Sequence, residues 1–142
     1  MTARMIFAAT CLLAAAPARA EVALQPGLWQ ETETGTENGR PTESETSTRC
    51  MTEEEAKQPG KAVTFDAVLR QHCKALDYKR SGDDLSLRLQ CGTQSLNVNI
   101  DAAFTLHTPQ HYSGSFKASV ELGPLTLSAD KTIDAKRIGD CK

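Results

Sequence analysis

Apolar and polar residues alternate strictly through the C-terminal half of the chain. The clearest run covers residues 96–106, where the apolar side chains fall on even positions. Residues 112–122 repeat the pattern, residues 125–135 repeat it more weakly, and residues 85–91 carry a shorter run. Successive residues of a strand point to opposite faces, so this period of two predicts strands with one buried face and one solvated face.

Short segments with turn-forming residues separate these runs. They are Ser81-Gly82-Asp83-Asp84, Cys91-Gly92-Thr93, Thr108-Pro109-Gln110 and Gly123-Pro124. Such short connections predict antiparallel neighbours, because parallel strands need a long crossover. Upstream, the polar segments 27–34 and 41–50 flank Glu37-Asn38-Gly39, and Asn-Gly between extended segments predicts a further hairpin.

One interval has the pattern of a short helix. Thr52 followed by Glu55 fits a capping box, Glu53 and Glu54 would lie in the first turn, and Pro59-Gly60 would end the helix. Residues 65–69 indicate a second short helical turn.

These elements predict a mainly β protein with a single domain at residues 21–142. We expect an antiparallel meander of about seven strands, with one short helix between the second and third strands. Strands with one apolar face can bury it in a sandwich or by curling the sheet. Long strands and meander connections favour a curled sheet or half-barrel.

The first twenty residues have the three parts of a signal peptide. Arg4 supplies a positive charge, residues 5–17 are apolar, and Ala18-Arg19-Ala20 provides small residues before a cleavage site. The apolar stretch is shorter than the roughly 20 residues that cross a bilayer. We therefore expect cleavage after Ala20 and a periplasmic or secreted protein that does not span the membrane.

The charge balance excludes some classes of partner. Loss of residues 1–20 removes two of the 16 basic side chains and none of the 18 acidic ones, which leaves a net charge of −4. Nucleic acids and anionic membranes both attract concentrated Lys and Arg, so we expect neither as a partner.

Four cysteines remain after the leader, at Cys50, Cys73, Cys91 and Cys141. An even number in an exported chain predicts two disulfides, and the wide spacings do not match the close pairs of zinc sites. Spacing does not choose among the three pairings. We predict Cys50–Cys73, which would tie down the helical connection, and Cys91–Cys141, which would fasten the C-terminal tail.

Several short motifs together resemble a known family. They are Pro26-Gly27-Leu28-Trp29-Gln30, the segment from Arg49 to Glu55, Cys73-Lys74, Asp77-Tyr78, Ser81-Gly82, Cys91 and Gly139-Asp140-Cys141. In this order they resemble the bacterial exported family called domain of unknown function 3617, over nearly the whole mature chain. The resemblance implies a β-rich envelope protein of Gram-negative bacteria with no assigned activity, and it supplies no catalytic or ligand-binding residues. Glu53 and Leu87 stand where the family commonly has Pro and Trp, departures that concern packing.

Candidate catalytic and metal-binding residues all have simpler explanations. His107 and His111 flank a turn and could share a metal, but no Asp, Glu or Cys accompanies them nearby, which favours solvated histidines. His72 could activate Cys73, although neighbours on a strand face opposite ways and a disulfide explains the cysteine. The chain lacks the common nucleophile, phosphate-loop and dinucleotide motifs. We therefore predict no catalytic residue, cofactor or metal, and regard an enzyme as unsupported.

Gly27-Leu28-Trp29 at the start of the first strand resembles the Gly-x-Trp start of lipocalin-like barrels, in which the Trp closes one end of a ligand cavity. The simpler explanation is that Trp29 is a buried residue of the core. A curled sheet with an aliphatic inner side could enclose a small apolar ligand. The candidate lining residues are Trp29, Leu87, Leu89, Val98, Ile100, Phe104, Tyr112, Phe116 and Val120. We therefore expect a non-enzymatic binding or accessory module for a small apolar ligand or a periplasmic protein partner. The alternatives are a structural envelope protein acting through a strand edge and an enzyme of unrecognised type.

Overall fold

The computed structural model describes residues 21–62, 73–93 and 96–142. Within them lie β1 (Gly27–Glu37), β2 (Arg40–Pro41), β3 (Glu45–Met51), α1 (Glu53–Lys57), α2 (Pro59–Ala62), β4 (Cys73–Ser81), β5 (Asp84–Thr93), β6 (Leu96–Thr108), β7 (His111–Leu122) and β8 (Leu125–Gly139). The protein is therefore mainly β, as the alternating pattern predicts.

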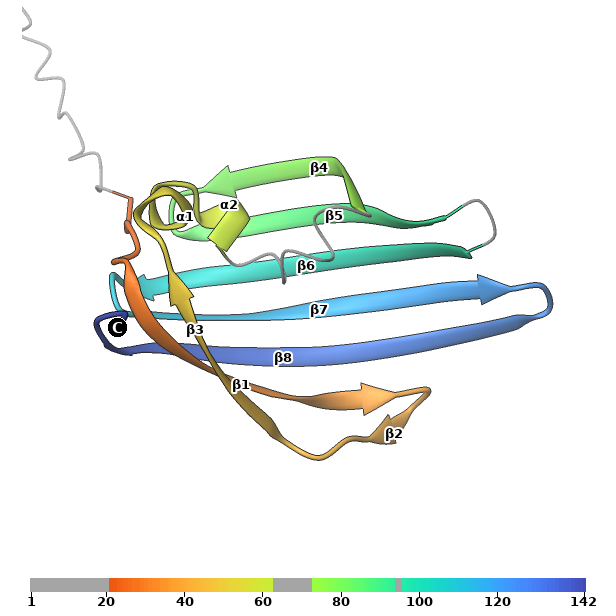
Figure 1. Ribbon diagram of the computed structural model, residues 1–142. Coiled ribbons are helices and arrows are strands. Elements are labelled where there is room, and N and C mark those ends of the chain that lie inside the picture. The colour runs from red at the N-terminus through yellow and green to blue at the C-terminus, as the bar shows by residue number, and fades with distance from the viewer. Residues whose placement is uncertain (1–20, 63–72, 94–95) are drawn as a thin grey trace, which may run out of the picture.

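All strands belong to one antiparallel sheet in the order β2-β1-β8-β7-β6-β5-β4. β3 also pairs with β1, on the side away from β8. β4 to β8 follow one another as a meander, whereas β1 joins the sheet beside the last strand. In Figure 1 the long strands β4 to β8 form a curved layer, and β1 with β3 turns across one side of it. The sheet is curled and does not close, since β4 forms one edge and β2 and β3 lie at the other.

The predicted turn chemistry fixes most of the connections. Turns lie at residues 82–83, 109–110 and 123–124, between the strand pairs that the sequence indicates. Asn38 and Gly39 both have positive φ, 50° and 76°, as a two-residue hairpin turn of the Asn-Gly kind requires. The exception is Cys91-Gly92-Thr93, where a break is predicted and β5 instead continues through all three residues.

The short helix expected between the second and third predicted strands is α1. It lies between β3 and β4 because the second predicted strand, residues 41–50, covers both β2 and β3, and a further short helix, α2, follows it. The capping box is present: the Glu55 amide donates to the Thr52 hydroxyl, and the Thr52 amide donates to the Glu55 carboxylate. Pro59 does end α1, but it also begins α2, where its missing N–H costs nothing. A Cβ on Gly60 would come within 2.5 Å of the Tyr78 ring, so α2 lies directly against β4. The helical turn predicted at residues 65–69 lies outside the described residues.

The two faces of the sheet differ sharply. We call the side that carries the aromatic rings of Trp29 and Tyr112 the inner face, and the opposite side the outer face. The core is on the inner face and consists of Leu24, Trp29, Met51, Ala56, Leu85, Leu87, Leu89, Cys91, Ile100, Ala102, Phe104, Leu106, Tyr112 and Ala135. Gly114 is required here, because a Cβ at that position would lie 2.1 Å from the ring of Phe104 on the neighbouring strand.

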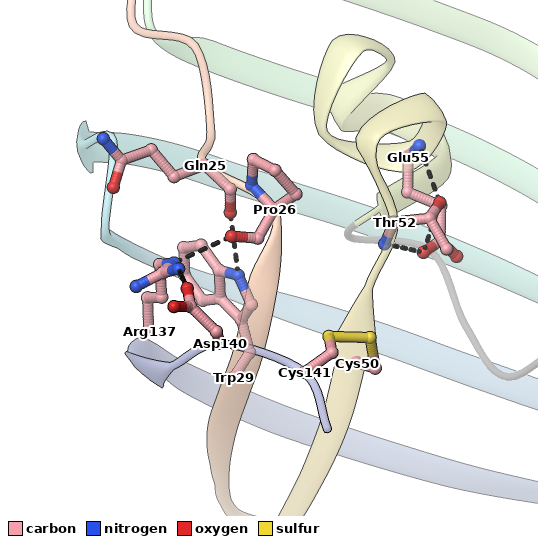
Figure 2. The surroundings of a disulfide bond; sticks show 9 residues. All are labelled: Gln25, Pro26, Trp29, Cys50, Thr52, Glu55, Arg137, Asp140 and Cys141. Atoms are coloured by element: carbon pink, nitrogen blue, oxygen red, sulfur yellow. Dashed lines mark hydrogen bonds and ion pairs between the residues drawn. A yellow bond between two sulfur atoms is a disulfide. The ribbon is translucent and has the colours of Figure 1, made fainter.

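Both disulfides form, but the predicted pairing is wrong. The bonds are Cys50–Cys141 and Cys73–Cys91, with Cα atoms 5.6 and 3.9 Å apart. Cys73 and Cys91 are directly opposite each other in β4 and β5. Cys50 lies on β3, next to β1, and the pairing of β1 with β8 brings the C-terminal tail within reach (Figure 2).

The Cys50–Cys141 bond is at one end of the sheet, which we call the closed end. There the segment before β1 is held by backbone contacts: the indole N–H of Trp29 donates to the Gln25 carbonyl at 3.0 Å, and the Gln25 amide donates to the Pro109 carbonyl at 2.8 Å. Arg137 donates to the Pro26 carbonyl at 2.8 Å and pairs with Asp140 (Figure 2). These contacts fix the N-terminal segment over the ends of β6, β7 and β8.

Removing each disulfide should destabilise the fold by a different amount. By the chain-entropy estimate, a loop of 91 residues is worth about 4.6 kcal/mol and one of 18 residues about 3.2 kcal/mol. We expect C50S/C141S to lose more free energy of unfolding than C73S/C91S in urea titrations. Non-reducing peptide mapping of the unchanged protein should recover the same two pairs, and a peptide joining Cys50 to Cys73 would contradict the structure.

Candidate functional site

The side chains of the inner face become more exposed to solvent from the closed end toward the turn between β7 and β8. On β7, Tyr112 is 1% exposed, Val120 is half-buried and Leu122 is 40% exposed. On β8, Ala135 is completely buried and Leu125 is 54% exposed. We call the end at the β7–β8 turn the open end. Along β7 an apolar surface is therefore continuous from the core to solvent.

The register brings together the residues predicted to line a cavity. Six are buried in the core: Trp29, Leu87, Leu89, Ile100, Phe104 and Tyr112. Val98, Phe116 and Val120 are half-buried and lie farther toward the open end. Because the residues opposite one another in antiparallel strands share a face, the pairing of Val98 with Val120 and of Val120 with Leu127 extends the apolar surface across three strands.

Trp29 is a core anchor. Its side chain is completely buried, and its ring centroid lies 5.3 Å from that of Tyr112. The Tyr112 hydroxyl donates to Glu31 at 2.7 Å, and Arg49 donates to the same carboxylate oxygen at 2.7 Å. Burial raises the pKa of Tyr112, and the negative charge of Glu31 raises it further. Aromatic rings and a satisfied polar network thus fill the closed end.

Tyr112 should make stability fall at alkaline pH. A phenol whose pKa is raised in the folded state stabilises the fold fully below the unfolded tyrosine pKa of about 10, and this contribution is lost as the pH rises above that value. We expect the free energy of unfolding to fall above about pH 10, and Tyr112→Phe to remove that slope while costing about 1–3 kcal/mol at neutral pH. Urea titrations at pH 7 to 11 measure both effects. Tyr78→Phe, at a half-exposed position, is the control, and an equal effect of both substitutions would contradict the assignment.

Charged residues interrupt the apolar inner face on β1 and β8. Lys131 on β8 lies 3.5 Å from a carboxylate oxygen of Glu33 and 3.1 Å from one of Glu37, both on β1. Its side chain is only 12% exposed, whereas those of Glu33 and Glu37 are 34% and 58% exposed. In the register Lys131 is opposite Phe116 of the inner face, and Glu37 is opposite Ala129. We call Glu33, Glu37 and Lys131 the ionic cluster.

Sequence reasoning missed the ionic cluster, although a signal was present. In β1, glutamates hold positions 31, 33 and 37 while threonines hold 32, 34 and 36. This is also a period of two, but both sets are polar, so the apolar alternation that marks the other strands is absent here. Thr34 bonds to Thr132 at 2.9 Å on the outer face, and the glutamates accordingly point inward.

The outer face is polar and its charges alternate across the strands. In register order these are Asp77, Arg88, Asp101, Lys117 and Asp130. Arg88 pairs with Asp101 at 2.8 Å and Lys117 with Asp130 at 3.4 Å. Such exposed pairs contribute little stability. Two depressions of about 620 and 360 Å³ are lined by Lys79, Ser86, Ala103 and Ser115 on this face, and the smaller one also by Asp77, Arg88, Asp101 and Lys117 of the charged row.

His107 and His111 come together without forming a catalytic relay. Their ring centroids are 4.7 Å apart, but Nε2 of His107 contacts the Ser113 hydroxyl at 2.7 Å and Nε2 of His111 contacts Asp134 at 2.7 Å. A serine nucleophile needs both nitrogens of one imidazole, one toward the serine and one toward the acid. Here the serine and the acid contact different rings: Ser113 contacts His107, and Asp134 contacts His111. The hydrogen bond with His111 lowers the pKa of Asp134.

The described ranges contain neither a cluster of metal ligands nor a helix that could span a membrane. Among residues 21–62, 73–93 and 96–142, no group of three or more His, Cys, Asp or Glu side chains is placed to hold a metal ion. The helices within those same ranges are too short and too polar to cross a bilayer. Cys73 is in a disulfide, and its neighbour His72 lies outside the described residues.

The fold and the inner face define a class: a small antiparallel β protein with a curled, open sheet, two disulfides and an apolar inner face that is covered at one end only. The model of the family described as protein of unknown function (DUF3617) matches residues 24–141, and the chain belongs to that family. The match confirms the family resemblance seen in the cysteines and the motifs around them. No curated protein and no solved structure matches the chain.

Proposed function

We propose that this protein is an exported, non-enzymatic binding module that holds a small apolar ligand on the inner face of its sheet. The observation that carries the proposal is the rise in exposure along the apolar face of β7, from Tyr112 at 1% to Leu122 at 40%, and at the adjoining end of β8, where Leu125 is 54% exposed. Soluble proteins seldom leave a continuous apolar surface open to water unless something binds to it.

The dimensions of the open part suit an extended hydrocarbon chain. Phe116 and Leu122 are six residues apart on β7, which is about 20 Å along a strand. The side chains in between on this face are small or aliphatic, and the register continues them onto β8 as Ala129 and Leu127. A chain lying along β7 and β8 would cover these residues, and complete burial of each Val or Leu side chain is worth about 1.5–3 kcal/mol.

Export is part of the proposal. Residues 1–20 have the composition of a cleavable leader but lie outside the described residues. The two disulfides are compatible with an oxidising compartment outside the cytoplasm. A periplasmic location would place the protein among lipids and their metabolites, which are ligands of the required apolar character.

The two alternative functions have less support. Strand addition at β4 would meet a bulge at Leu76 and the charged side chains of Lys74 and Lys79, which are features that oppose edge pairing. Enzymatic activity would need a catalytic group with a place for substrate, and the two histidine contacts on the outer face do not form such a relay.

An uncharged fluorescent probe, N-phenyl-1-naphthylamine, tests the proposal directly. We expect the disulfide-bonded protein to bind the probe, and Val120→Asp to weaken binding at least about tenfold because it places a carboxylate on the apolar surface. Ser119→Asp is the matched control, since it adds the same charge one residue away on the outer face. Thermal unfolding of both variants establishes that they remain folded.

Two results would sink the proposal. One is absence of probe binding to the folded protein, and the other is an equal loss of binding in both aspartate variants. Native mass spectrometry of the periplasmic protein gives an independent measurement, in which a retained small molecule supports the proposal. A complex that contains only a second protein would instead support the accessory-module alternative.

A further inference from the structure

The inner face is apolar on one side and acidic on the other. β5, β6 and β7 present leucine, isoleucine, valine, alanine and phenylalanine to it, whereas β1 presents Glu31, Glu33 and Glu37. The last glutamate of β1, Glu37, is opposite Ala129 in the half-buried part of the inner face.

The charges of the ionic cluster do not balance. Lys131 carries one positive charge against the two carboxylates of Glu33 and Glu37, which leaves one negative charge within the cluster. Glu31 is balanced separately by Arg49. Arg40 on β2 is opposite Glu37 and brings one further cation, while Glu45 on β3 is opposite Glu33 and brings one further carboxylate. The excess of one negative charge therefore remains.

We propose that the ligand is a cationic amphiphile: a single hydrocarbon chain that lies along β7 and β8, with an ammonium head group beside Glu37 and Glu33. This inference rests on the proposed function, since it names the chemical class of ligand for the same surface. It excludes fatty acids and other anionic amphiphiles as preferred ligands.

The register places the head group and the chain at suitable positions. Glu37 is opposite Ala129, and Ala129 is opposite Ala118, so the carboxylate is two strands from the middle of the apolar surface. Two strand spacings are about 10 Å, which an extended glutamate side chain and a head group can bridge together. Glu37 is more exposed than Glu33, so a cation can bind to it without displacing core side chains.

Electrostatics near an apolar surface strengthens this preference. Charge interactions are weaker in water than beside low-dielectric material, so a carboxylate at the border of the apolar surface attracts a bound ammonium more strongly than it would in open solvent. A bound anionic head group would meet net negative charge in the same place. The preference should weaken with salt, because Glu37 is solvent-accessible.

Three amphiphiles with the same twelve-carbon chain separate the head-group effect from the chain effect. Displacement of N-phenyl-1-naphthylamine by dodecyltrimethylammonium, dodecanol and dodecyl sulfate, each below its aggregation concentration, gives three affinities. We expect the cation to bind at least about tenfold more tightly than the alcohol, and the sulfate to bind least tightly.

Two variants should move this preference in opposite directions. Glu37→Gln should reduce the ratio of cation affinity to alcohol affinity by about threefold or more, and Lys131→Gln should increase it, since it removes the competing positive charge. Glu121→Gln, on the outer face of β7, is the matched control and should leave the ratio unchanged. Dodecanol should bind with similar affinity to all three variants.

The outcomes distinguish this inference from the proposed function. If dodecanol displaces the probe and the cation binds no more tightly, the surface binds apolar chains and the head-group assignment is wrong. A ratio that responds equally to Glu37→Gln and Glu121→Gln would also overturn the assignment, because the effect would then come from net charge. If none of the three amphiphiles binds, the proposed function itself fails.

Discussion

The pairing of β1 with β8 is the contact on which the rest of the structure depends. It joins the first strand to the last through a register that runs from Leu28 to Glu37, and it carries β3 along on the other side of β1. Without it β4 to β8 would be a simple meander with an uncovered apolar face. With it, Trp29 reaches Tyr112, Cys50 reaches Cys141, and the closed end forms.

The parts of the fold that depend on neighbours in sequence were predictable. The apolar alternation fixes which side chains of β5 to β8 face inward, and the turns follow from local residues such as Asn38-Gly39 and Gly123-Pro124. The disulfide pairing was not predictable on these grounds. Cys50 and Cys141 are 91 residues apart and meet only because β1 lies beside β8. No local sequence pattern predicts that strand pairing.

The same distinction applies to the candidate site. Residues such as Val98 and Val120 were correctly assigned to one face because an apolar side chain in an alternating strand goes to the buried side. The glutamates of β1 alternate with threonines, and a polar strand has no intrinsic preference between its faces. Their direction is settled by partners on other strands: Tyr112 and Arg49 for Glu31, and Lys131 for Glu33.

The open sheet and the acidic side of the inner face belong together physically. Closing the sheet into a barrel would bury the carboxylates of Glu33 and Glu37 with one lysine between them, and desolvation of an unbalanced charge is costly. In the open sheet Glu37 stays 58% exposed while it borders the apolar surface. Hydrated carboxylates and an accessible apolar surface can therefore lie on one face only when the sheet does not close into a barrel. That combination is what recognition of an amphiphile requires, because the ligand itself has one part that needs water and one part that avoids it.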